Sequence, residues 1–97
     1  MFTIIKTERF DKWLDKLKDR HARLRILDRI DSMIDGNLGD VKPVGEGVSE
    51  TRIHYGPGYR LYFCKQGEVV IVLLCGGDKS TQSKDIERAK EIKKCLK

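Results

Sequence analysis

The 97-residue sequence has no long hydrophobic run, no export signal and no pattern of paired cysteines. Its longest apolar run, Val69 to Cys75, is far shorter than the roughly 18 residues that a membrane span needs. Residues 1–6 are too short for a signal-peptide core and contain no cleavage-site pattern. The three cysteines are odd in number, widely separated and without a Cys-x-x-Cys pair, which argues against disulfides and structural zinc. We therefore expect one cytoplasmic domain, residues 1–97, with no membrane contact.

Metal-ligand patterns are missing too, because no cluster of Asp, Glu and His has suitable spacing. We expect neither a metal nor another cofactor. The sequence does have positive charge: 20 Lys and Arg against 15 Asp and Glu, a net charge of +5, with most of the excess near the C-terminus. A basic surface favours RNA, DNA or an acidic protein partner. The same excess is also compatible with a role in solubility alone.

The spacing of apolar residues predicts three helices. A short strand at residues 2–5 precedes Thr7, which can cap the first helix. The second helix runs from about residue 19 to residue 35 and ends at Gly36, and the very short connection predicts a helical hairpin. A final helix reaches residue 96. The apolar stripe of the first helix consists of Phe10, Trp13, Leu14 and Leu17. The expected inward residues of the second are Leu27, Ile30 and Ile34.

Between these helices the apolar period changes to two, which predicts strands. A strand at residues 41–44 bends at Gly45-Glu46-Gly47 and leads into a hairpin with a three-residue loop, Gly56-Pro57-Gly58. A two-residue turn at Gln66-Gly67 then leads to residues 69–75, the most apolar segment and therefore an expected central strand.

The hairpin has one polar and one apolar face. A three-residue loop pairs His54 with Arg60, Arg52 with Tyr62, and Ile53 with Leu61. The polar face then carries Glu50, Arg52, His54, Arg60 and Tyr62. The turn at residues 66–67 would place Val70, Val72 and Leu74 on the core side, and Ile71 and Leu73 beneath the polar face. Arginine forks suit phosphate and tyrosine rings suit stacking on bases, which predicts a surface that binds a phosphodiester. The alternative is a solvated charge pair worth little free energy.

Lys79 lies in the sequence Gly76-Gly77-Asp78-Lys79, directly after the expected central strand. The segment fails as a phosphate loop, since that motif needs a glycine immediately before the lysine. A loop residue at this place can bring a cation to the sheet face, or it can simply be solvated.

These segments together resemble a known family. The matching strings are Gly-Val-Ser-Glu-Thr-Arg-Ile at residues 47–53, Gly-Pro-Gly-Tyr-Arg-Leu-Tyr at 56–62 and Leu-Cys-Gly-Gly-Asp-Lys-Ser-Thr-Gln at 74–82. They resemble the RelE/ParE superfamily of bacterial toxins, and more narrowly its HigB-like, phage-derived addiction module killer branch. The resemblance implies an α+β, RelE-like fold, with an N-terminal helical hairpin and a C-terminal helix packed on an antiparallel β-sheet. It also implies the toxin of a type II toxin–antitoxin system, neutralised by a cognate antitoxin that is often a helix-turn-helix DNA-binding protein.

Many members of this superfamily are endoribonucleases that cut mRNA in the ribosomal decoding site. By motif position, Arg52, Arg60 and Lys79 resemble the cationic active-site residues, with Glu50 and Tyr62 as further catalytic candidates. Candidates for RNA contact are His54, Gln82 and Lys84. The C-terminal residues 93–97 lack the tyrosine or histidine that several members use, so Glu50, Tyr62 and His54 all stay candidates for proton transfer.

The resulting hypothesis is metal-independent cleavage of mRNA. The ribose 2′-hydroxyl attacks the adjacent phosphate, Arg60 and Lys79 stabilise the added negative charge, and Arg52 positions the backbone. Two alternatives remain open: a non-catalytic, ParE-like inhibitor of DNA gyrase, and an inactive relative that only binds the antitoxin.

Overall fold

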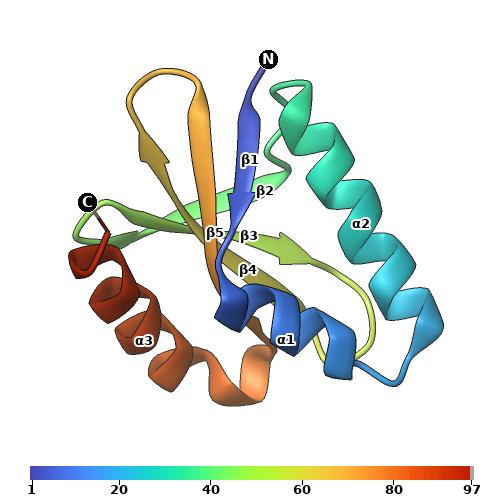
Figure 1. Ribbon diagram of the computed structural model, residues 1–97. Coiled ribbons are helices and arrows are strands. Elements are labelled where there is room, and N and C mark those ends of the chain that lie inside the picture. Colours follow the sequence, from blue (N-terminus) through green and yellow to red (C-terminus); the bar gives the residue numbers. More distant parts are fainter. Residues whose placement is uncertain (97) are drawn as a thin grey trace.

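A five-stranded sheet lies between two helices on one face and a third helix on the other in the computed structural model (Figure 1). The elements in chain order are β1 (Thr3–Lys6), α1 (Glu8–Lys16), α2 (Arg20–Ile34), β2 (Asp40–Gly45), β3 (Val48–Ile53), β4 (Tyr59–Gln66), β5 (Val70–Gly77), a 3₁₀ turn (Lys79–Thr81) and α3 (Gln82–Lys94). The structure describes residues 1–96, so Lys97 of the expected 1–97 domain lies outside it. The predicted α+β class is confirmed.

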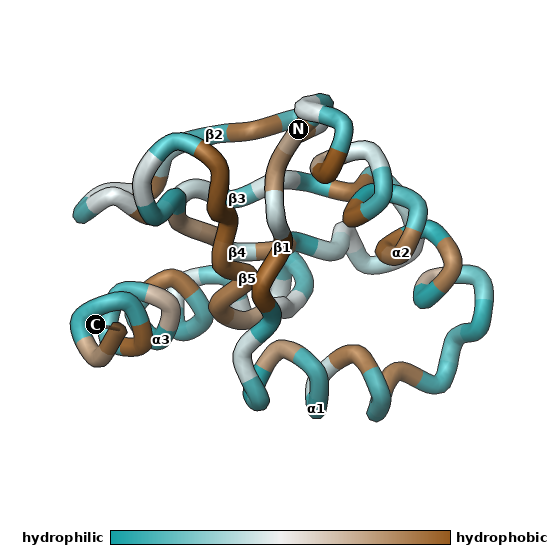
Figure 2. The backbone as a smooth tube through the Cα atoms, turned by 45° about the horizontal axis from the view of Figure 1, so that its top comes forward, coloured by the Kyte–Doolittle hydropathy of each residue, from teal (hydrophilic) through white to brown (hydrophobic). Residues whose placement is uncertain are grey.

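The strand order is β1-β5-β4-β3-β2. Strands β2 to β5 form antiparallel pairs, as expected, whereas β1 pairs in parallel with β5. A parallel partner needs a long crossover connection, and here α1, α2 and three strands lie between the two. Figure 2 shows the long apolar stretch along β5, which is buried by helices on both faces. Within residues 1–96 no helix has the length and apolar character to cross a membrane.

The N-terminal helices follow their predicted signals closely. Thr7 accepts a hydrogen bond from the Phe10 N–H (3.1 Å) and so caps α1, while Asp19 caps α2. The expectation for the inward face of α2 was partly wrong, because Leu27 is 43% exposed. Ile30 is buried as predicted, and the remaining buried residues of α2 are Ala22, Ile26 and Met33. The helix is therefore rotated so that positions 22, 26, 30 and 33 face the sheet.

The predicted hairpin register is wrong by two residues. Arg60 lies opposite Arg52 and not opposite His54, because β3 ends at Ile53 and residues 54–58 form a five-residue loop. Two backbone hydrogen bonds tighten this loop, from the Tyr55 N–H to Ile53 and from the Gly58 N–H to Tyr55. The observed pairs still join residues of equal parity, so the division into faces survives the change of register.

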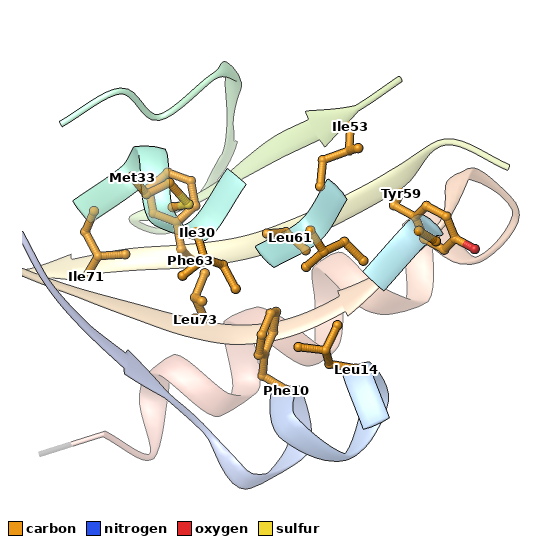
Figure 3. Packing of buried hydrophobic residues seen from close by; sticks show 12 residues of the cluster. Phe10, Leu14, Ile30, Met33, Ile53, Tyr59, Leu61, Phe63, Ile71 and Leu73 are labelled. Carbon is orange, nitrogen blue, oxygen red and sulfur yellow. The ribbon is translucent and has the colours of Figure 1, made fainter. Parts of the chain in front are cut away.

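The prediction for β5 is wrong about its faces. The loop between β4 and β5 has three residues, since Gln66 pairs with Val70, and the register shifts at Leu74. Ile71 and Leu73 therefore pack with the α1 and α2 side of the sheet (Figure 3). The residues of β5 on the α3 side are Val70, Val72, Leu74 and Cys75. Leu74 and Cys75 share a face although they are neighbours, as a β-bulge allows.

Candidate functional site

A row of four residues crosses one end of the sheet. Asp40 of β2 lies opposite Arg52 of β3, Arg52 opposite Arg60 of β4, and Arg60 opposite Gly77 of β5. Side chains of directly opposite residues share a face, with Cβ atoms roughly 5 Å apart. The two arginine side chains therefore start from neighbouring positions on the face that α3 partly covers.

Arg60 is held firmly within this row. Its side chain is only 10% exposed, its Nη1 donates to the carbonyl oxygen of Gly58 (2.9 Å), and its Nε lies 3.5 Å from Oε2 of Glu50. That Nε has no hydrogen-bond partner among residues 1–96, so the contact with Glu50 is an ion pair without a hydrogen bond. The guanidinium is thus oriented from two sides before any ligand arrives.

Glu50 and Tyr62 lie beneath α3 and not on the surface. Glu50 is 1% exposed, and both of its carboxylate oxygens accept hydrogen bonds from Nε2 of Gln82, at 3.3 and 3.2 Å. Tyr62 is opposite Glu50, fully buried, and its hydroxyl has no hydrogen-bond partner within the described chain. Burial, helped by the negative charge of Glu50, raises the pKa of the Tyr62 hydroxyl well above its usual value. Neither side chain can stack on a base or meet a substrate from solvent.

Asp40 is a member of the site that the sequence did not reveal. Nη2 of Arg52 donates to its Oδ1 at 3.2 Å, and Nε2 of His54 lies 2.7 Å from its Oδ2. The hydrogen bonds with His54 and Arg52 hold the pKa of Asp40 below its ordinary value. His54 is largely exposed, so this dyad of His54 and Asp40 faces solvent. Asp40 could have been found from the sequence only through its position opposite Arg52, which depends on the register between β2 and β3.

Arg29 of α2 supports the same row from the opposite face. Its Nη1 donates to Oγ1 of Thr51 (2.6 Å) and to the carbonyl oxygen of Arg52 (2.8 Å), while the Thr51 hydroxyl donates to Leu38. These bonds fix the backbone of β3 where Arg52 projects. Sequence spacing alone could not indicate that a helix surface arginine reaches a strand 23 residues away.

Lys79 approaches the row from the segment after β5. Its backbone N–H donates to Pro57 in the hairpin loop (3.4 Å). A Cβ built on Gly58 would lie 3.4 Å from Nη1 of Arg60 and 3.7 Å from Cβ of Lys79, so these two side chains flank one glycine. Lys84 is exposed on the first turn of α3 and has no ion-pair partner in residues 1–96.

The two glycines at the end of β5 are required by close packing. A Cβ on Gly76 would overlap the Trp13 ring, and a Cβ on Gly77 would overlap the carboxylate of Asp85. This close packing leaves a groove of about 670 Å³ between α1 and α3, where β5 ends. Among residues 1–96 no group of three or more His, Cys, Asp or Glu is placed to hold a metal ion.

No family model matches the chain, but it is similar to a known protein sequence and to a solved structure. A protein of Haemophilus influenzae described as uncharacterized is 53% identical over 81 residues, which covers 84% of this chain and 82% of the relative. The structure of the E. coli toxin RelE, solved as a mutant in the free state, matches with a TM-score of 0.70 over 98% of both chains. Sequence identity to that structure is 17%, so the match concerns the fold.

Proposed function

We propose that the chain is the toxin of a type II toxin–antitoxin system: it belongs to the same family as the Haemophilus influenzae protein and has the RelE fold. Within the superfamily we assign it to the HigB-like branch and to metal-independent cleavage of translated mRNA at the ribosome, in the cytoplasm. Its partner is a cognate antitoxin, which we expect to be a helix-turn-helix DNA-binding protein. The observation that carries the nuclease assignment is the cross-strand pair Arg52–Arg60 with Lys79 beside it.

The arrangement suits a reaction in which negative charge builds up on a phosphate. Arg60 is oriented in advance by Gly58 and Glu50, and oriented donors stabilise a charged transition state more than flexible ones do. Arg52, held by Asp40, is suited to fix the RNA backbone, and Lys79 is exposed and adds a second cation beside Arg60.

The burial of Glu50 and Tyr62 favours His54 for proton transfer. Asp40 can hold the imidazole through Nε2, as carboxylates hold histidines in many acid–base sites. Glu50 then acts by positioning Arg60, and Gln82 acts by holding Glu50. His54 would accept the proton of the 2′-hydroxyl or pass it to the leaving oxygen.

Lys79→Ala provides the test that disturbs the fold least, because Lys79 is exposed. We expect this variant, expressed in growing cells without antitoxin, to lose growth arrest and to leave transcripts intact in a translating lysate. Lys18→Ala is the matched control: it also removes one exposed lysine, in the connection between α1 and α2, and should remain toxic. Thermal melts of both variants should match the parent.

Three results would contradict the proposal. One is retained cleavage by both Lys79→Ala and Arg60→Ala. Another is blocked supercoiling by DNA gyrase with intact RNA, which would favour the ParE-like alternative. The third is the absence of any growth arrest by the parent chain, which would indicate an inactive, antitoxin-binding relative.

A further inference from the structure

The groove between α1 and α3 takes no part in the chemistry described above. Its volume of about 670 Å³ lies within the range of roughly 300 to 1,000 Å³ that small-ligand sites occupy. It opens where β1 stops pairing: Lys6 lies beside Leu73, and beyond this point β5 has no strand on that side within the described chain. In Figure 1 the ends of α1 and α3 flank this part of β5.

The groove has an excess of positive charge. Its basic lining residues are Arg9, Lys12, Lys16 and Arg88. Of its three carboxylates, Glu8 pairs with Lys12 (2.9 Å). Asp78 and Asp85 accept hydrogen bonds from the neutral Ser80 N–H (2.9 Å) and Thr81 hydroxyl (2.5 Å) and keep their charge, so the lining has one more positive than negative group. Arg9, Lys16 and Arg88 form no ion pair within residues 1–96. The lining is therefore suited to an anion.

Trp13 gives the groove a flat aromatic wall. The ring is half-buried, lies against the backbone of Gly76, and is supported by Phe10 and Tyr59, whose ring centroids are 5.7 and 6.2 Å away. A rigidly held indole is a good platform for a nucleobase, since stacking on aromatic side chains depends little on base identity. An indole beside free arginines matches the two parts of a nucleotide, its base and its phosphate.

We infer that this groove binds one nucleotide of the RNA next to the bond that is cut, with its base against Trp13 and its phosphate near Arg9 and Arg88. The inference rests on the proposed function. It is supported by continuity, because Gly77 lines the groove and is also the cross-strand partner of Arg60. Neighbouring strands lie about 4.8 Å apart, so the groove begins one strand away from the backbone of Arg60.

Trp13 is the only tryptophan of the chain, so its fluorescence reports on the groove directly. The probe is a 2′-O-methyl hexaribonucleotide, which has no free 2′-hydroxyl and cannot be cut. We expect saturable quenching of Trp13 that coincides with binding measured by fluorescence anisotropy of a labelled probe. Arg88→Gln should weaken binding severalfold and reduce the slope of log affinity against log salt by about one.

Lys94→Gln is the matched control, because it removes one positive charge from the same helix at an exposed position outside the groove. It should leave affinity and quenching unchanged. The inference would be overturned if both variants lost affinity equally, if the probe bound without quenching Trp13, or if no binding occurred up to millimolar probe. Quenching of Trp13 by an acidic peptide but not by RNA would also overturn it. If RNA quenches Trp13 but the protein cuts no mRNA, only the cleavage proposal is rejected. If the protein cuts mRNA but RNA does not quench Trp13, only the nucleotide site in the groove is rejected.

Discussion

Replacing Glu50 with glutamine tests whether this carboxylate positions Arg60 or takes part directly in proton transfer. Glu50 is 1% exposed and the Arg60 side chain 10%, so the pair is shielded from solvent. Removing one partner of a buried ion pair costs roughly 3–5 kcal/mol, because the other charge loses its compensation. Glutamine keeps the shape and one acceptor oxygen, so we expect a loss of about 3 kcal/mol in the free energy of unfolding, near the lower end of that range.

The loss is large against a total stability of about 5–15 kcal/mol and should lower Tm by about 12 °C or more. Urea unfolding followed by circular dichroism measures it for Glu50→Gln, Arg60→Met and the double variant. If the two side chains stabilise each other, the double variant should lose clearly less than the sum of the single losses, by about 1–3 kcal/mol. A change below about 0.5 kcal/mol for Glu50→Gln, together with lost RNA cleavage, would show that Glu50 acts in the chemistry and refute this reasoning.

Gly77→Ala should destabilise the protein by about 1–3 kcal/mol in urea unfolding, because the added Cβ would overlap the Asp85 carboxylate. Adding Asp85→Ala to the same chain should restore part of this loss. An unchanged urea midpoint for Gly77→Ala would contradict the packing. The pKa of Asp40 is lowered in the folded state, so its pairing stabilises the protein above the ordinary carboxyl pKa of 3.8 and is lost as pH falls further. The free energies of unfolding of the parent and of Asp40→Asn in urea should therefore converge as the pH falls below 3.8, and a constant difference would argue against the pairing. Burial raises the pKa of the Cys75 thiol to about 12, so iodoacetamide at neutral pH should label only the exposed Cys95, and rapid labelling of a second cysteine in the folded protein would contradict the burial.

Local signals in the sequence accounted for most of the fold. The cap at Thr7, the start of α2 near Asp19, the apolar stripe of α1 and the apolar strand β5 all appear where the sequence predicts them. The errors arose at connections. A loop longer by two residues moved the β3–β4 register, and a turn longer by one residue, followed by a bulge, exchanged the faces of β5. Side-chain period in a strand is two, so a single residue in a turn decides which face is buried.

For the site, alternation along β3 and β4 was enough to predict that Arg52 and Arg60 share a face, because equal parity holds in both the expected and the observed register. Alternation could not predict which polar residues of that face are exposed. The placement of α3 buried Glu50 and Tyr62, and the register of β2 brought Asp40 to Arg52 and His54. Both depend on contacts between segments far apart in the chain.

The amino-acid sequence by itself determined the class of fold, the approximate bounds of the helices and the presence of a cationic hairpin, because each follows from the spacing of neighbouring residues; only the end of α3, at Lys94, falls short of the predicted residue 96. Only the tertiary structure decided that Glu50 lies beneath a helix, that Asp40 joins the arginine row, and that Trp13 and Asp85 pack on Gly76 and Gly77 to leave a groove. The reason is physical: periodicity determines which way a side chain points from its own strand or helix, whereas burial depends on what another part of the chain places over it.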